Sequence, residues 1–180
     1  SLESAIALKP DDLRIYPTVV LKGTVLEGMY MQGRFEPLSL AEAVERCSSM
    51  LKRLQGLSIN LIRMGLQSGE DLQQGALVAG PYHPAFKELA INEWIYDRCR
   101  EHMIPGKAYQ LSSNKKYASK VVGQKRRTLQ RLMAYTGRPV VFVEDTDMHK
   151  GEVRIAEISD TYDATEVRSL GMGIVCHFHS

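Results

Sequence analysis

The first hundred residues alternate between segments that predict β-strands and segments that predict helices. Leu13 to Leu21 is rich in β-branched and aliphatic residues and predicts a buried strand, with a bulge or an unpaired position at Pro17. Ile59 to Met64 is a second short aliphatic strand. Strands that alternate with helices form parallel sheets with crossover connections, so this order predicts an α/β fold whose ligands meet the loops at the carboxyl ends of the strands. Two strands cannot bury a parallel sheet on both faces, and partner strands are therefore expected outside this segment.

Pairs with capping-box spacing predict where two helices begin. Thr24 with Glu27 predicts a short helix that ends near Gly33, and Ser39 with Glu42 predicts a longer one. The longer helix carries an apolar stripe at helical spacing, and Gly56 is placed to end it; the stripe is formed by Leu40, Ala43, Val44, Cys47, Leu51 and Leu54. A third helix is predicted to open at Pro84, after a glycine-punctuated loop over residues 65–84 that is long enough to be functional or disordered.

Three stretches of this region resemble a known enzyme superfamily. They are RIYPTVVLKGTVLEGMYMQGRFEPLSLAEAV (residues 14–44), INLIRMGLQSGEDL (residues 59–72) and VAGPYHPAFKEL (residues 78–89). The first resembles a segment late in the catalytic domain of radical S-adenosylmethionine (SAM) enzymes of the Elongator catalytic-subunit type. The others are similar to a bacterial branch often related to oxygen-independent coproporphyrinogen oxidase. The resemblance covers about residues 11–90.

The resemblance implies the last βα units of a partial (β/α) barrel. Such a barrel holds an iron-sulfur cluster on a CxxxCxxC motif, and the cluster cleaves SAM to a radical. This sequence contains no such motif. SAM and the cluster are therefore expected in the complete enzyme, with no cofactor on this chain. Since the chain opens at Ser1 rather than at a methionine, we expect a processed product or a piece of something longer. The missing barrel half is expected upstream or on a partner chain.

By the same resemblance, six residues are expected at the inner surface or the strand ends, near the cofactor. These are Tyr16, Lys22, Arg63, Gln67, Tyr82 and His83. Each also has a structural alternative: Tyr16 as a core hydroxyl, Arg63 in an ion pair and His83 as the cap of the helix at Pro84. No catalytic residue and no metal ligand is assigned.

Charge is segregated along the chain. Residues 107–143 contain nine Lys and Arg residues and no Asp or Glu, although the whole chain has a formal net charge of only +2. A local positive field favours phosphate binding, because neutralised phosphates release condensed counterions. The alternative interpretation is a solvated helix face.

The basic segment resembles a type I KH domain. Its predicted order is strand, helix, helix, strand, strand, helix, with segments at residues 107–111, 117–122, 128–135, 140–143, 153–158 and 164–170. KH helices meet at a GxxG loop that approaches the nucleic-acid backbone closely. Here the loop reads GQKR, and Arg126 stands at the fourth position. This departure puts the backbone clamp in doubt but adds a guanidinium that can grip phosphate.

Nine residues are predicted to bind RNA, and cations at a helix N-terminus support this because they oppose the helix dipole unless an anion binds. They are Lys115, Lys116, Lys120, Gly123, Gln124, Lys125, Arg126, Arg127 and Arg131. RNA is favoured over DNA, and transfer RNA in particular, because the Elongator type acts on transfer RNA. The predicted division is a βα domain over residues 1–105 and a KH-like α+β domain over residues 106–180.

Other classes find little support in the sequence. Cys47, Cys99 and Cys176 lack the paired spacing of a disulfide framework or a metal knuckle. No stretch is long and apolar enough to span a bilayer or to act as a secretory signal, so a cytoplasmic protein is expected. The tail Cys176-His177-Phe178-His179 is predicted as a terminal strand or a disordered end, and the acidic residues from Asp145 to Glu152 as a hairpin loop.

Three functions stay open at this stage. The first is the C-terminal part of a radical SAM enzyme that modifies RNA, inactive by itself. The second is a stand-alone KH-type RNA-binding protein. The third is a radical SAM enzyme acting on a tetrapyrrole or another small molecule, with the basic face recognising propionates.

Overall fold

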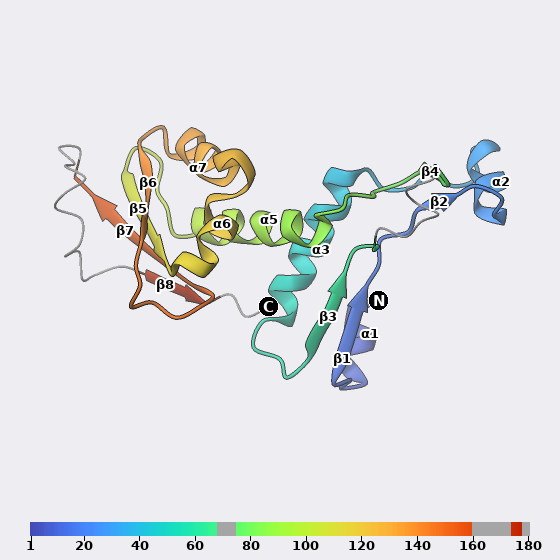
Figure 1. The fold of residues 1–180 in the computed structure, drawn as a ribbon, viewed down its shortest axis with the longest axis horizontal. Coiled ribbons are helices and arrows are strands. Elements are labelled where there is room, and N and C mark those ends of the chain that lie inside the picture. The colour runs from blue at the N-terminus through green and yellow to red at the C-terminus, as the bar shows by residue number, and fades with distance from the viewer. Residues whose placement is uncertain (68–74, 160–173, 178–180) are drawn as a thin grey trace. The chain divides into compact units, whose positions relative to one another are not determined.

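The computed structural model describes residues 1–67, 75–159 and 174–177, and the chain divides into two compact units. Unit 1 is Ser1–Ala90 and unit 2 is Ile91–Ser180. The predicted helix at residues 164–170 and His179 of the tail lie outside the described residues. Both units mix helices with strands (Figure 1), as the predicted α/β class requires.

Unit 1 is built around a parallel strand pair with a helical crossover. β1 (Asp12–Ile15) pairs in parallel with β3 (Asn60–Met64), and the connection between them contains α2 (Val25–Met31) and α3 (Leu40–Leu54). A bidentate ion pair of Arg53 with Glu3, at 2.8 and 2.9 Å, ties α3 to α1 (Leu2–Ala7). The predicted parallel arrangement is therefore confirmed in this pair.

The single strand predicted from Leu13 to Leu21 is wrong. The structure has two short strands there, because Pro17 lacks the N–H that a continuous strand would need. β2 (Val20–Leu21) instead pairs antiparallel with β4 (Leu77–Ala79), which lies in the segment predicted as a long loop. Residues 12–21 thus contribute to two different sheets.

The helix starts follow the capping pattern of the sequence. Ser39 Oγ accepts from Glu42 N at 3.2 Å and Glu42 Oε2 accepts from Ser39 N at 2.9 Å, which completes the capping box of α3. Hydrogen bonds from the Ser39 side chain and backbone hold the pKa of Glu42 below its usual value. At α2, Thr24 caps as expected, but Glu27 accepts from the N–H of Gly23 rather than from that of Thr24.

Unit 2 is a mixed sheet with two helices inserted between its parallel strands. The strand order is β6 (Val140–Glu144), β5 (Ala108–Ser113), β7 (Glu152–Ile158) and β8 (Ile174–His177). β5 is parallel to β6 and antiparallel to β7. The crossover from β5 to β6 contains α6 (Lys115–Val122), the 3₁₀ turn η1 (Gln124–Arg126) and α7 (Arg127–Thr136).

Helix α5 (Phe86–Arg100) provides much of the core of unit 2. Trp94 and Ile95 are fully buried, together with Leu111 of β5 and Leu132 of α7. Asn92 Nδ2 donates to the carbonyl oxygen of Lys120 at 2.6 Å, which fixes α6 against α5. Apolar burial is the dominant favourable term in folding, so this packing holds α6 and α7 in place.

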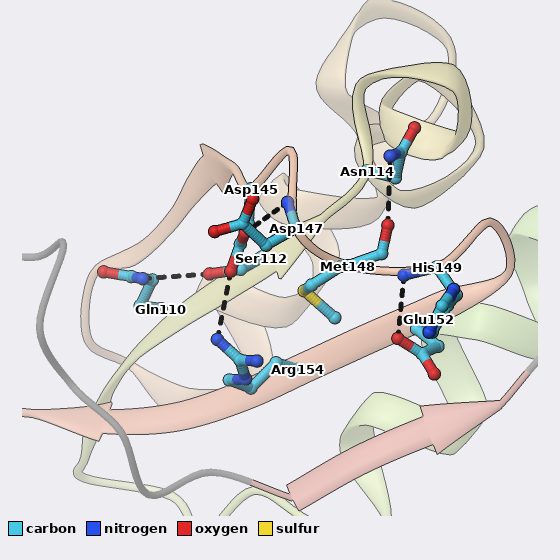
Figure 2. A network of polar contacts seen from close by, with 9 residues as sticks. All are labelled: Gln110, Ser112, Asn114, Asp145, Asp147, Met148, His149, Glu152 and Arg154. Atoms are coloured by element: carbon cyan, nitrogen blue, oxygen red, sulfur yellow. Dashed lines mark hydrogen bonds and ion pairs between the residues drawn. The ribbon is translucent and has the colours of Figure 1, made fainter.

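The acidic residues predicted as a hairpin loop do not form one, because β5 lies between β6 and β7 in the sheet. Figure 2 shows that the carboxylates of Asp145 and Glu152 join this connection to itself and to β7. Asp145 accepts from the N–H of Asp147 and pairs with Arg154, each at 3.0 Å, and Glu152 accepts from the N–H of His149 at 2.9 Å. These acids therefore stabilise a crossing connection.

Among the described residues, no helix combines the length and the apolar character needed to cross a membrane.

The α3 capping box predicts a measurable loss of stability. We expect Ser39→Ala to lower the free energy of unfolding by about 1 kcal/mol, because the N–H of Glu42 loses its side-chain acceptor. Urea unfolding followed by circular dichroism measures it. Ser49→Ala is the matched control, since Ser49 lies inside the same helix and only bonds back to Glu45 O. It should be neutral or stabilising, and an equal loss in both variants would contradict the capping role.

Candidate nucleic-acid interface

The cations of the basic segment divide into those with partners and those without. Lys107 Nζ lies 2.7 Å from Glu157, and Lys120 Nζ lies 5.1 Å from the centroid of the Tyr117 ring. Arg131 makes a bidentate pair with Glu93, at 2.5 and 2.8 Å. Its guanidinium also lies 3.7 Å from the centroid of the Tyr96 ring. The bond to Glu93 raises the pKa of Arg131, so this charge is committed to joining α7 and α5.

The turn between α6 and α7 carries three exposed cations. Lys125, Arg126 and Arg127 are exposed, and among the described residues none of them has an ion pair. Their position at the start of α7 was predicted from the sequence. We call the segment Gly123–Arg127 the basic loop.

The backbone of the basic loop takes conformations that L-residues adopt rarely. Lys125 (φ 51°, ψ 33°) and Arg126 (φ 61°, ψ 23°) are left-handed, and Arg127 (φ −60°, ψ −39°) returns to the right-handed helical region. The N–H groups of Arg126 and Arg127 donate to the carbonyl oxygens of Gly123 and Gln124, so these backbone donors close the turn itself. Arg126, at the N-cap of α7, makes no side-chain cap hydrogen bond.

Gly123 lets the basic loop fold back on the first turn of α7. With φ 75° and ψ 163° it occupies a region that is almost restricted to glycine. A Cβ at this position would overlap Thr128 Oγ1 and lie 3.0 Å from Thr128 N. Thr128 is 3% exposed. It was missed in the sequence analysis, because no sequence pattern marks a residue whose role is to support a loop. The glycine predicted for nucleic-acid approach is thus also needed for packing.

Lys115 and Lys116 lie at the opposite end of α6. Both are exposed in the first turn, where Asn114 caps the helix by accepting from Lys116 N at 3.0 Å. An eight-residue helix is about 12 Å long, so these lysines form a second positive site separate from the basic loop. Gln124 is exposed within the loop itself.

The six residues predicted near a cofactor are brought together only in part. Arg63 donates to Gln67 after the end of β3, but Tyr16 follows β1 and Lys22 follows β2, and both are exposed. His83 Nδ1 accepts from Ala85 N at 3.0 Å, which is the capping role given as its structural alternative. Tyr82 is half-buried beside it in sequence.

Residues 10–97 match a family model, the Radical_SAM C-terminal domain. The match supports a radical SAM family member. It covers unit 1 from residue 10 onward and α5 up to residue 97, and most of unit 2 lies outside it. No curated protein and no solved structure matches the chain significantly.

A radical SAM domain implies SAM and an iron-sulfur cluster in the full enzyme. The side chains present here do not fit cluster ligands. All three cysteines are buried, and burial raises the pKa of the Cys47 thiol to about 11 and also raises the pKa of Cys99 and of Cys176. Cluster ligands are thiolates, and the described residues contain no group of three or more His, Cys, Asp or Glu able to hold a metal ion. No chemical step is therefore assigned to a cluster on these residues.

Gly123 gives a test of the loop geometry. We expect Gly123→Ala to lower the stability of unit 2 by about 3 kcal/mol, because the new methyl group meets Thr128 and the backbone conformation becomes strained. Fluorescence of Trp94, the single tryptophan and a buried residue of unit 2, reports its unfolding in urea.

Gly137→Ala is the matched control. Gly137 ends α7 with φ 66°, and a Cβ there has nothing within 4 Å. Gly137→Ala should lower the stability by only about 1 kcal/mol, which is the cost of a left-handed conformation at a residue with a Cβ. Equal losses in the two variants would show that Thr128 does not confine the loop.

Proposed function

We propose that this chain is the C-terminal portion of a radical SAM enzyme that modifies RNA, and that unit 2 binds the RNA through the basic loop. SAM and the iron-sulfur cluster belong to the complete enzyme, on barrel strands located upstream or on a partner chain. The family match over residues 10–97 supports the radical SAM half of this proposal. Transfer RNA is the favoured substrate, because the Elongator type that the sequence resembles acts on it.

The edges of the β1–β3 strand pair support the barrel half of the proposal. In the described residues these parallel strands form a sheet of only two, and each has an unpaired edge. Parallel sheets are almost always buried on both faces, so a two-stranded one suits a position beside further strands. Additional barrel strands would satisfy both edges.

The single observation that carries the RNA half is a set of cations at one turn that have no ion pair with any described residue. Lys125, Arg126 and Arg127 are adjacent in sequence and exposed, whereas Lys107 and Arg131 of the same segment are neutralised by carboxylates. Like charges that repel one another at the positive end of a helix dipole are costly without an anion. A phosphate bound at the loop would relieve both effects.

The side chains of the basic loop suit phosphate in particular. The backbone N–H groups of Arg126 and Arg127 already donate to the carbonyl oxygens of Gly123 and Gln124, so the guanidiniums are the groups that can donate to a phosphate in two-pronged fashion. At the position of the missing glycine, Arg126 adopts the left-handed conformation that a glycine would favour, directly after the left-handed Lys125. We propose that unit 2 acts as a KH-like domain with this modified loop, in the order β5, α6, loop, α7, β6.

A salt series with transfer RNA tests the proposal. We expect this chain to bind labelled transfer RNA, and the triple variant Lys125→Ala/Arg126→Ala/Arg127→Ala to lose roughly two to three in the slope of log K against log salt, because three phosphate contacts disappear. Fluorescence anisotropy measures both values.

The matched control removes three exposed cations from unit 1, namely Arg34, Arg46 and Lys52, with the same composition of one Lys and two Arg. It should leave the slope unchanged. Equal losses in both variants would indicate nonspecific attraction. Absence of binding at low salt, with binding of a tetrapyrrole instead, would favour a small-molecule substrate.

Substitution of Arg131 tests whether this cation is structural or binds RNA. We expect Arg131→Gln to lower the stability of unit 2, since it breaks the bidentate pair with Glu93, and to change RNA affinity less than Arg127→Gln does. Trp94 fluorescence in urea and anisotropy with transfer RNA give the two readouts. A larger loss of affinity in Arg131→Gln, at unchanged stability, would return Arg131 to the RNA surface.

A further inference from the structure

Two arginines lie side by side on the parallel strands of unit 1. Arg14 of β1 and Arg63 of β3 are register partners, and both are exposed. Neighbouring strands are about 4.8 Å apart, and register partners project from the same face of a sheet. The side chains of Arg14 and Arg63 therefore project from adjacent positions on one face of the sheet.

A bulge produces this juxtaposition. The register runs Leu13 with Leu61 and then Arg14 with Arg63, so Ile62 is left over. An unbroken register would have put Arg14 opposite Ile62 and Arg63 opposite Ile15. One extra residue reverses which face a side chain occupies, and bulges recur where a sheet re-aims a side chain toward a site. The bulge here moves Arg63 onto the face that carries Arg14.

That face of the strand pair is polar. Asn60 Nδ2 donates to Asp12 Oδ1 at 2.9 Å, which shows that these register partners share it. The other face carries apolar register partners that are buried or half-buried: Leu13 with Leu61, and Ile15 with Met64. The arginines are thus presented on the exposed side of an amphipathic sheet.

The two positive charges have no carboxylate partner among the described residues. Arg63 donates to the neutral amide oxygen of Gln67, and the nearby Asp12 is bonded to Asn60. Like charges directly across a strand pair destabilise the sheet. An anion between the guanidiniums would reverse the sign of that interaction.

The pair also lies toward the carboxyl end of both strands. Ile15 ends β1 and Met64 ends β3, and Gly65 N donates to Ile15 O at 2.9 Å just beyond them. Ligands of parallel sheets meet the protein at this end. Gln67 lies in the loop that follows β3 and restrains Arg63 from there.

We propose that Arg14 and Arg63 form a two-arginine clamp for an oxyanion, a carboxylate or a phosphate group, with Gln67 as a positioning residue. Both groups offer paired oxygens that match the two-pronged donors of a guanidinium. The clamp rests on the register of β1 and β3 and not on the basic loop, which belongs to unit 2.

Arginine side-chain NMR with inorganic phosphate tests the clamp on the whole chain. At constant ionic strength, the Nε–Hε signals of Arg14 and Arg63 should shift together and saturate. Arg14→Gln should weaken phosphate binding about three- to tenfold, through the loss of one guanidinium partner, and should reduce the response of Arg63. Without phosphate, Arg14→Gln should melt no earlier than the unmutated chain, because it removes a repulsion.

Arg34→Gln is the matched control. Arg34 donates to Gln32 at 3.2 Å, as Arg63 donates to Gln67, but it lies in the turn after α2 and outside the strand pair. Its substitution should leave the phosphate response unchanged. Unsaturable shifts of equal size at Arg14, Arg34 and Arg63 would overturn the clamp, as would a lower melting temperature of Arg14→Gln without phosphate.

The source of the oxyanion is resolved in a second titration, in the background Lys125→Ala/Arg126→Ala/Arg127→Ala. SAM offers a carboxylate and a short single-stranded RNA offers phosphodiesters. Whichever of the two molecules displaces phosphate from the clamp, and no longer displaces it in the Arg63→Gln variant, is the source of the oxyanion. Because the three cations of the basic loop are absent in this background, failure of the RNA proposal does not affect the result. Phosphate binding that is insensitive to Arg63→Gln would overturn the clamp.

Discussion

Parallel strand pairing determines how both units present charge. Parallel neighbours cannot be joined by a hairpin and need a crossover, usually a helical one. The pair β1–β3 is crossed by α2 and α3, and the pair β5–β6 by α6 and α7. The second crossover creates the turn that carries the basic loop, and the first aligns two strands whose exposed face carries the arginine pair. Each concentration of positive charge is therefore a consequence of a parallel pair.

Local positive charge in this chain has two physical uses. Where a carboxylate is within reach, the cation joins elements, as Arg131 joins α7 to α5 through Glu93 and Arg53 joins α3 to α1 through Glu3. Where the part of the chain that the structure describes offers no carboxylate partner, the charge stays exposed, as at Arg126 and at Arg14. Because a helix dipole and neighbouring like charges both disfavour this second state, it is the one that indicates a ligand.

Much of the local structure could be predicted from the sequence. Capping-box spacing and apolar periodicity placed α2 and α3, because both signals depend on residues three or four apart. The α6–α7 turn and its cations were also predicted, since glycine and a charge run are visible in the chain itself. The single strand from Leu13 to Leu21 failed because Pro17 interrupts it and the two pieces pair with different strands, β1 with β3 and β2 with β4. The hairpin at Asp145 failed because another strand, β5, separates β6 from β7 in the sheet.

The sequence by itself determined the helices, the charged segment and the likeness to radical SAM proteins, all of which depend on residues close together in the chain. The tertiary structure decided which charges are neutralised, as for Arg131 by Glu93, and which lie together, as for Arg14 and Arg63. Register and side-chain pairing between distant segments have no short-range signature, because they follow from packing and from a bulge of one residue. Those long-range contacts separate the structural cations from the candidate binding residues.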